Sequence, residues 1–373
     1  MKKFTILIAA LALVCFSVPV MAADWNFYGS ARMQTTYFSD DYDDTSNNAG
    51  TDTKDTDMEW DLQGNTRFGA RVKAEKLAGR VEFGVNESTI TSRLLYGEWN
   101  FGGGKLLVGK DYTPGGSQFI SSSIQTGRSE GDGAGDDGNI LGLGTFYGGR
   151  HGQIKLTFGG FQVALIESSV PNPSPATAAA FGSGDYDDQL PKLQAEWGMA
   201  FDTWNFSIAG GAQTYQVEDV TSTVAGAGTD DVDVTSYMAS GMGAWNIGAF
   251  TLKAALSYAV NGGNAGWTAG AGTWDGDDDV DDVKTFQGAL VGVFRMSDML
   301  AFEGGFGYRQ DKYDANVAED KTKQSQVYVQ ALWTMAPGVY LMPEIGYVDW
   351  GKNTSDQDTG TTFYAGAKWQ IDF

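Results

Sequence analysis

Residues 58–73, MEWDLQGNTRFGARVK, decide the fold class of this chain. Every even position from Met58 to Val72 is apolar or small, and every odd position except Gly69 carries a charge or an amide. Only an extended strand puts two such sets of side chains on opposite faces. The stretch is also far longer than the ~5–6 residues of an ordinary globular strand. It therefore predicts a tilted strand that crosses a membrane, with one face toward lipid and the other toward water.

The same alternation recurs along the chain, for example in residues 24–38, 249–262 and 360–373. Sixteen such segments begin near residues 24, 58, 79, 91, 104, 152, 161, 189, 203, 233, 249, 282, 299, 322, 338 and 360. After residue 23, no apolar run approaches the ~20 residues that a membrane helix requires. If this chain crosses a membrane, we expect it to cross as strands.

The connections between these segments alternate between long and short. Long loops follow the odd-numbered segments and occupy residues 39–57, 87–91, 112–151, 169–188, 217–232, 263–281, 313–321 and 352–359. Tight turns follow the even-numbered segments, as at residues 101–104, 159–160, 246–248 and 337–338. This asymmetry is typical of outer-membrane barrels, and hydrocarbon excludes an open sheet edge. We therefore predict an all-β fold, a closed 16-stranded antiparallel transmembrane β-barrel with short periplasmic turns and long external loops.

The first 23 residues have the pattern of a signal peptide. Lys2 and Lys3 precede an apolar run over residues 4–20, and Ala22 supplies the small residue near a cleavage site. We expect residues 1–23 to be removed and residues 24–373 to form the barrel domain in the outer membrane. Cys15 is the only cysteine and leaves with the signal peptide, so the mature chain has no disulfide and no cysteine-based metal site.

Composition excludes some classes of function. A formal net charge of −22 argues against nucleic acid as a partner. Aromatic residues make up 13% of the chain and glycines number 51, which suits an outer-membrane barrel rather than a disordered chain. The single histidine, His151, has no nucleophilic serine motif to serve. We therefore do not expect an enzyme.

Two short motifs resemble the Gram-negative general, non-specific porins. Residues 104–114, GKLLVGKDYTP, are similar to the fifth-strand signature of that family. The terminal aromatic Phe373, in KWQIDF, resembles the signal that the barrel-assembly machinery reads. Within the family, the homotrimeric porins of sulfate-reducing bacteria are the nearest match. The resemblance implies a homotrimer whose third loop, residues 112–151, folds into each barrel and narrows the pore opposite a ladder of basic residues.

The sequence departs from the family pattern in two loops. The second loop, residues 86–91, is short, whereas in the family it latches over a neighbouring subunit. The third loop lacks the family's Pro-Glu-Phe-Gly-Gly run.

Strand alternation and the resemblance together nominate the pore-lining residues. The basic candidates are Arg32, Arg67, Arg71, Lys110, Arg150 and Lys155, with Arg80, Lys192 and Lys368 as companions. The acidic candidates on the third loop are Glu130, Asp132, Asp136 and Asp137. Opposed charges of this kind would set up a transverse field across the pore. The alternative is that the cations are solvated residues paired with nearby acids such as Glu59 and Asp61.

The long loops are strongly acidic. In residues 263–281 the carboxylates of Asp275, Asp277 and Asp279 are candidate Ca²⁺ ligands, although their spacing is not that of an EF-hand. A solvated anionic rim, bridged to lipopolysaccharide by divalent ions, is the preferred interpretation. No other cofactor is expected.

The sequence therefore predicts a porin, a water-filled channel for passive diffusion of small hydrophilic solutes and ions. A channel selective for anions or sugars is one alternative, and a surface adhesin or anchor barrel is another. The sequence does not decide the solute, its size limit, the preference between cations and anions, or the gating.

Overall fold

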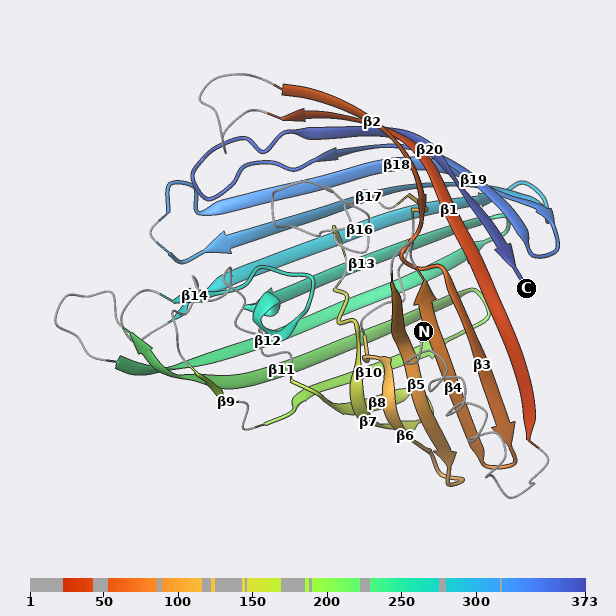
Figure 1. Cartoon of the computed structure of the whole chain (residues 1–373), viewed down its shortest axis with the longest axis horizontal. Helices are drawn as coiled ribbons and strands as arrows, with labels where there is room; N and C mark the ends of the chain where they lie inside the picture. The colour runs from red at the N-terminus through yellow and green to blue at the C-terminus, as the bar shows by residue number, and fades with distance from the viewer. Residues whose placement is uncertain are drawn as a thin grey trace, which may run out of the picture.

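The computed structural model describes residues 23–42, 53–85, 89–115, 122–124, 143–144, 146–168, 185–187, 190–221, 229–274, 280–315 and 317–373. These residues form one 18-stranded antiparallel sheet, a small two-stranded ladder of β14 and β15, and a single 3-10 helix (Figure 1). The strands are β1 (Asp24–Tyr42), β2 (Thr53–Leu62), β3 (Arg67–Ala74), β4 (Leu77–Val85), β5 (Ile90–Asn100), β6 (Lys105–Tyr112), β7 (Arg150–Phe158), β8 (Phe161–Ile166), β9 (Asp185–Asp187), β10 (Lys192–Ala200), β11 (Trp204–Thr221), β12 (Thr229–Ile247), β13 (Phe250–Val260), β14 (Thr273–Trp274), β15 (Val280–Asp281), β16 (Val283–Arg295), β17 (Leu300–Tyr313), β18 (Lys321–Ala336), β19 (Val339–Asp349) and β20 (Thr361–Asp372); the 3-10 helix is η1 (Gly262–Ala265).

The 18 strands of the large sheet amount to 16 barrel strands. β2 and β3 follow one another along β1, and β9 and β10 follow one another along β11, so each pair is one interrupted strand. Every predicted segment corresponds to one of the sixteen, which confirms the predicted fold class. Among the described residues no helix is long and apolar enough to cross a membrane.

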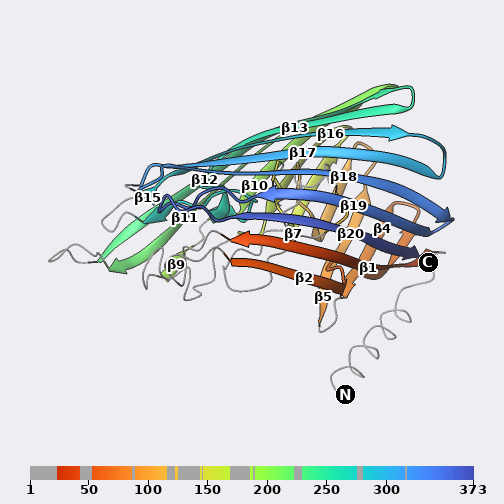
Figure 2. The same ribbon diagram turned by 90° about the horizontal axis from the view of Figure 1, so that it is seen from above.

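The first and last strands close the barrel. β1 pairs with β20 from Ser30–Asp372 to Asp41–Thr361 (Figure 2). Gly29 and Phe373 extend the ladder by one further rung, because each donates its backbone N–H to the carbonyl oxygen of the other, at 2.7 and 3.0 Å. The closed sheet has no free edge, which is what a spanning sheet requires.

The stretch that predicted the fold is interrupted in the structure. Met33 pairs with Leu62 and Ser30 pairs with Arg67, so residues 63–66 stand opposite only two residues of β1. Residues 63–66 outnumber their two partners by two, which is an even number. Odd-numbered residues therefore point to the same side of the sheet before and after the break. Thr66, expected to face lipid, is instead buried, and its hydroxyl donates to the backbone oxygen of Arg32 at 2.8 Å. The prediction of one continuous strand was wrong at these four positions.

Long and short connections alternate as predicted except between β4 and β5, where residues 86–89 make a link no longer than the turn at residues 101–104. The short ones include residues 75–76, 159–160 and 248–249. The loop expected at 217–232 is shorter than predicted, because β11 and β12 continue their ladder through Val217–Val232 and on to Thr221–Thr229. Their extension is held by a cluster of buried apolar side chains: Tyr215, Val217, Val220, Val232 and Val234.

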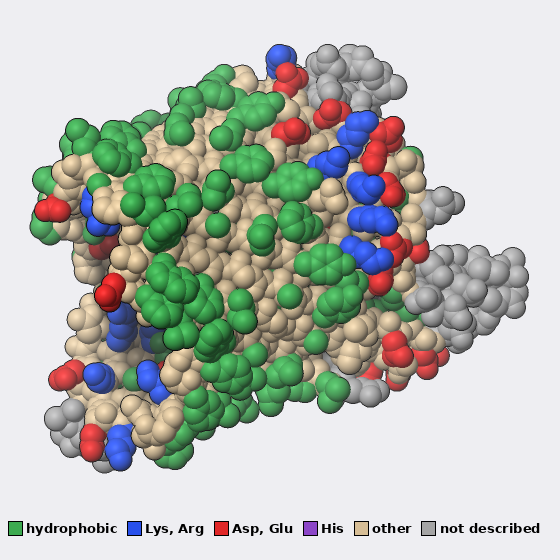
Figure 3. Space-filling model, turned by 180° about the vertical axis from the view of Figure 1, so that it is seen from behind, with side chains coloured by type: hydrophobic (Ala, Val, Ile, Leu, Met, Phe, Trp, Pro, Cys, Tyr) green, Lys and Arg blue, Asp and Glu red, His purple; other side chains and the backbone are tan. Residues whose placement is uncertain are grey.

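Burial in this protein is inverted relative to a soluble domain. Large apolar side chains such as Leu256, Leu290 and Val329 are exposed on the outer face, where Figure 3 shows a broad band of hydrophobic residues. The buried side chains of the wall are largely polar, and Gln194 and Gln287 have no exposed surface. The outer face therefore suits lipid, while the inner face surrounds a polar lumen.

Candidate functional site in the barrel lumen

The described parts of the third loop lie inside the barrel. The backbone N–H of Gly115 donates to Glu196 on β10 at 2.8 Å, and the side-chain amide of Gln194 donates to the Pro114 oxygen at 3.0 Å. Further along, the Gly144 N–H donates to Gln287 on β16 at 3.1 Å. All of these wall residues are buried on the lumen side, so the predicted inward fold of the third loop is confirmed for these segments.

Residues 122–124 of the third loop are held against the far wall of the barrel by a buried carboxylate. Glu344 on β19 accepts the Ser122 hydroxyl and the Ser123 backbone N–H, both at 2.6 Å. The Ser123 hydroxyl donates to Gln330 on β18 at 2.6 Å, and the amide of Gln63 donates to the Ser123 oxygen at 2.6 Å. The described parts of the loop thus contact β10 at residues 114–115 and β18 and β19 at residues 122–123.

An apolar cluster extends this attachment. Ile124 and Leu143, both of the third loop, are buried against wall residues. The complete cluster consists of Phe38, Ile124, Leu143, Val348, Trp350 and Tyr364.

A second loop also enters the lumen, which sequence reasoning missed. Residues 261–274 were expected to form part of an external acidic loop, but Ala265 and Trp267 are buried. The Lys192 ammonium donates to the Ala265 oxygen at 2.8 Å and lies 5.8 Å from the Trp267 ring centroid. This inward segment supports the third loop, because Tyr147 donates its N–H to the Thr268 hydroxyl at 2.8 Å.

One wall of the lumen is strongly basic. At its centre the Glu82 carboxylate is fully buried and accepts hydrogen bonds from Arg80 at 2.7 Å and Arg93 at 2.9 Å. The Tyr28 hydroxyl donates to the same carboxylate at 2.8 Å, and Arg67 lies 3.6 Å from it. A single carboxylate therefore partly neutralises three guanidinium groups.

Three more cations belong to this wall. Arg32 donates to Ser30 at 2.8 Å, and the Arg71 guanidinium carbon lies 5.0 Å from the Tyr28 ring centroid. Lys368 on β20 is buried in register with Gln34 of β1. We call the whole set the basic wall, defined by Arg32, Arg67, Arg71, Arg80, Arg93 and Lys368.

Arg93 was not among the predicted lumen residues. Leu95 and Trp99 on the same strand are exposed outward, so simple alternation would turn Arg93 toward lipid. A β-bulge between β4 and β5 shifts the register at this point, and the Arg93 side chain reaches Glu82 inside. A charge at a lipid-facing position is costly, and that cost is the signal from which the bulge could have been predicted.

Two predicted cations have local partners. Lys155 lies 2.7 Å from the Asp111 carboxylate, so for this residue the alternative of a locally paired lysine holds. The Arg150 guanidinium carbon lies 5.4 Å from the Tyr112 ring centroid. Tyr112 in turn accepts a hydrogen bond from Arg93 at 3.4 Å, so Arg150 is linked to the edge of the basic wall.

Lys110 does not lie where alternation along its own segment suggested. The register sets it level with Leu95 on one side and Gly152 on the other. Leu95 is exposed on the outer face, and directly paired residues of neighbouring strands project to the same face of a sheet. The prediction of an inward Lys110 was therefore wrong. The motif around Gly109 correctly predicted a strand, but it did not predict which side chains of that strand point into the lumen.

Several predicted residues lie outside the described part of the chain. They are Glu130, Asp132, Asp136 and Asp137 of the third loop and the calcium candidates Asp275, Asp277 and Asp279. Within the described ranges no group of three or more His, Cys, Asp or Glu side chains is arranged to hold a metal ion. Of the proposed local acid partners, Glu59 accepts a hydrogen bond from Gln34 at 3.0 Å.

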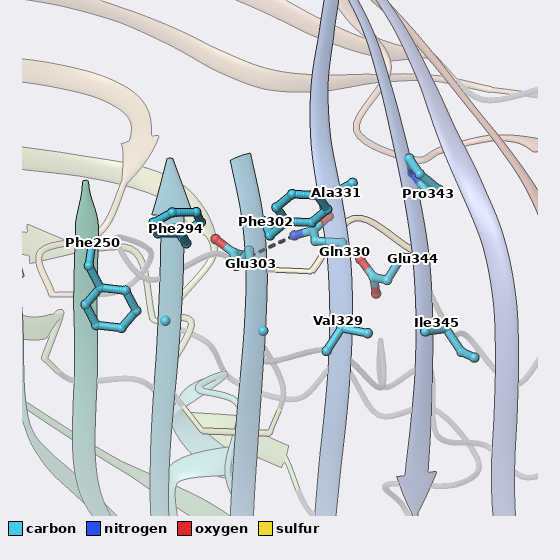
Figure 4. A pocket seen from close by; sticks show the side chains of 12 residues that line it. Phe250, Phe294, Phe302, Glu303, Val329, Gln330, Ala331, Pro343, Glu344 and Ile345 are labelled. Carbon is cyan, nitrogen blue, oxygen red and sulfur yellow. Dashed lines mark hydrogen bonds between the residues drawn. The ribbon is translucent and has the colours of Figure 1, made fainter. Parts of the chain in front are cut away.

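A groove on the outer face is separate from this lumen site. It crosses β13 and β16–β19 and is lined by exposed aromatic and aliphatic side chains, including Phe250, Phe302 and Ile345 (Figure 4). Glu303 and Gln330, which are hydrogen-bonded at 2.7 Å, lie in the same part of the wall but are buried. The groove therefore suits lipid chains rather than a polar solute.

The closed barrel, with its apolar outer face and polar lumen, is a fold that solved outer-membrane proteins share. The outer membrane channel DcaP of Acinetobacter baumannii matches with a TM-score of 0.69 and 17% identity over 95% of this chain and 99% of that one. The anion-selective porin of Comamonas acidovorans gives 0.60 and 13% over 94% and 100%, and Salmonella typhi OmpF, in complex with daunomycin, gives 0.56 and 12% over 95% and 99%. No protein-family model and no curated protein sequence matches the chain. At these identities the likeness establishes the porin fold.

Proposed function

We propose that this protein is an outer-membrane porin that forms a water-filled channel for passive diffusion of small hydrophilic solutes and ions. The observation that carries the proposal is the third loop, which contacts polar groups on β10, β16, β18 and β19 inside the barrel. A 16-stranded barrel is too wide for wall side chains to fill. A loop that crosses such a lumen narrows it, and polar lining keeps it wet.

Conductance in a planar bilayer tests this function. Purified protein should insert in discrete steps and conduct ohmically at low voltage. A Glu344→Ala variant tests the role of the loop attachment. It should still insert but give noisier or larger conductance steps, because Ser122 and Ser123 lose their acceptor. Protein that inserts into bilayers without any conductance step would contradict the channel and favour the adhesin or anchor alternative.

A preference for anions is the second candidate, favoured by the basic wall. Three of its six cations, Arg67, Arg80 and Arg93, converge on one buried carboxylate, Glu82, so this group of side chains carries an excess of positive charge. We propose that Glu130, Asp132, Asp136 and Asp137 of the third loop face this wall and complete a transverse field. The reversal potential in a salt gradient measures the balance, and a sign showing cation preference would exclude the anion-selective candidate.

The remaining features of the proposal concern export and assembly. We propose that residues 1–23 are a signal peptide, that the barrel-assembly machinery reads Phe373, and that the protein forms homotrimers like the porins of sulfate-reducing bacteria. A solved structure of Vibrio cholerae OmpT, which matches at a TM-score of 0.56, is described as a trimer form. Unboiled protein that migrates in SDS gels only as a monomer, with no trimer after crosslinking in membranes, would exclude the trimer.

A further inference from the structure

A row of lysines crosses the outer face near the long-loop end of the barrel. Lys284 on β16 pairs in register with Lys312 on β17, and Lys312 pairs with Lys321 on β18. Lys323 stands two residues below Lys321 on the same face of β18, opposite Gln310. Figure 3 shows basic side chains gathered along this edge of the outer face, with acidic ones beside them.

The charges of this lysine row are poorly compensated. Lys284 forms an ion pair with Asp314, but within the described residues the ammonium groups of Lys312, Lys321 and Lys323 have neither an ion pair nor a hydrogen bond. Two further carboxylates lie near the row. Asp282 accepts from Asn261 and acts with Asp314 on Lys284, and Glu319 accepts the backbone N–H of Lys321, but neither forms an ion pair with Lys312, Lys321 or Lys323. Like charges in directly paired positions repel one another, so this arrangement calls for an anion from outside the chain.

The surface next to the lysine row is apolar. On the same strands and the same face, toward the middle of the barrel, lie the exposed side chains of Phe286, Leu290, Phe306 and Val327. In the membrane orientation set by the long loops, the row therefore lies where headgroups of the outer leaflet meet the hydrocarbon. Lysine suits this position because its stem packs on apolar surface while its ammonium reaches the phosphates.

We propose that Lys284, Lys312, Lys321 and Lys323 bind the phosphate groups of an outer-leaflet lipid whose acyl chains lie along the apolar band beneath them. The site is independent of the channel, because all four side chains are on the outward face of the wall. It differs from the acidic-loop interpretation, in which divalent ions would bridge carboxylates to lipopolysaccharide, since here the contact is direct. Removal of divalent ions should therefore leave it intact.

The test compares two triple variants that change the net charge equally. The first is Lys312→Gln, Lys321→Gln, Lys323→Gln, which empties the row. The control is Lys54→Gln, Lys105→Gln, Lys352→Gln, three exposed lysines that each already have an acidic partner, Asp41, Glu98 and Asp356. Binding of diphosphorylated lipid A to detergent-solubilised protein with a chelator present is measured by native mass spectrometry. Since each lysine near a membrane surface contributes about a fivefold change in lipid affinity, the row variant should lose roughly 100-fold.

Three further measurements define the chemistry of the ligand. Dephosphorylated lipid A should bind both variants and the parent protein equally weakly, and inorganic phosphate at equal concentration should not displace lipid A. Lipid A should raise the thermal midpoint of the parent and the control but not of the row variant. Equal lipid A affinity in the row and control variants would overturn the proposal, as would displacement by inorganic phosphate. Unchanged conductance steps in the row variant would show that any loss of lipid is not a failure of the channel.

Discussion

Replacing Glu82 by Gln should destabilise the barrel and make the channel more anion-selective. The carboxylate is fully buried and holds Arg80 at 2.7 Å, Arg93 at 2.9 Å and the Tyr28 hydroxyl at 2.8 Å. An amide offers one acceptor oxygen instead of two and points an N–H group at a guanidinium. The substitution therefore leaves buried positive charge without its counter-ion.

The size of the expected loss in stability depends on how far the Glu82 cluster is shielded from water. Removing one partner of a buried ion pair costs about 3–5 kcal/mol. Here the Arg67 and Arg80 side chains keep 19% and 21% of their surface exposed to the lumen, so water compensates part of the loss. We therefore expect a decrease of about 3 kcal/mol in the free energy of unfolding, at the lower end of that range.

Urea unfolding of protein refolded into lipid vesicles, followed by tryptophan fluorescence, measures this loss. The matched control is Glu98→Gln, whose partner Lys105 lies 3.0 Å away with 48% of its side chain exposed. An exposed pair of this kind contributes less than about 1 kcal/mol. Equal stabilities of the Glu82→Gln and Glu98→Gln proteins would refute the view of Glu82 as the buried centre of the basic wall. A reversal potential that fails to move toward anions would refute its electrostatic role.

Three further outcomes are expected. Arg67→Glu should shift the reversal potential toward cations with little loss of assembly. Phe68→Arg places a charge against lipid at a cost of roughly 2–4 kcal/mol near the midplane, so this variant should assemble poorly. Heat-modifiable migration in gels measures the assembly of both variants. The reverse result would mean that the facing of β3 is wrong. Glu344→Gln keeps an acceptor for Ser122 and should leave conductance steps nearly uniform, whereas an increase in noise equal to that of the alanine variant would mean that the charge itself holds the loop. Phe373→Asp should lower outer-membrane yield measured by fractionation, while the assembled fraction still conducts; normal surface levels would show that this terminal aromatic carries no assembly information.

The sequence by itself determined the architecture because the alternation that defines a barrel strand is a local feature of the sequence. Alternation with a period of two identifies each strand and its two faces without knowledge of any partner. Short turns at residues such as 159–160 and long loops between other pairs then set the up-and-down order. The even number of strands and the exclusion of free edges in lipid led directly to closure.

Only the tertiary structure decided which charges meet inside. Arg93 turns inward because a bulge between β4 and β5 changes its facing, and Lys110 faces outward because its register partners do. Glu82 is the group on which arginines from three neighbouring strands, Arg67, Arg80 and Arg93, converge, and alternation within one strand could not reveal this meeting.

The inward course of residues 261–274 was equally invisible in the sequence. Lys192 and Trp267 meet only when the loop folds over β10, 75 positions away along the chain. Such contacts arise from pairings between strands and loops far apart in sequence, whereas alternation reports only on immediate neighbours. The physical reason for the division is therefore range: local periodicity specifies a strand's faces, and long-range register and bulges specify what those faces bring together.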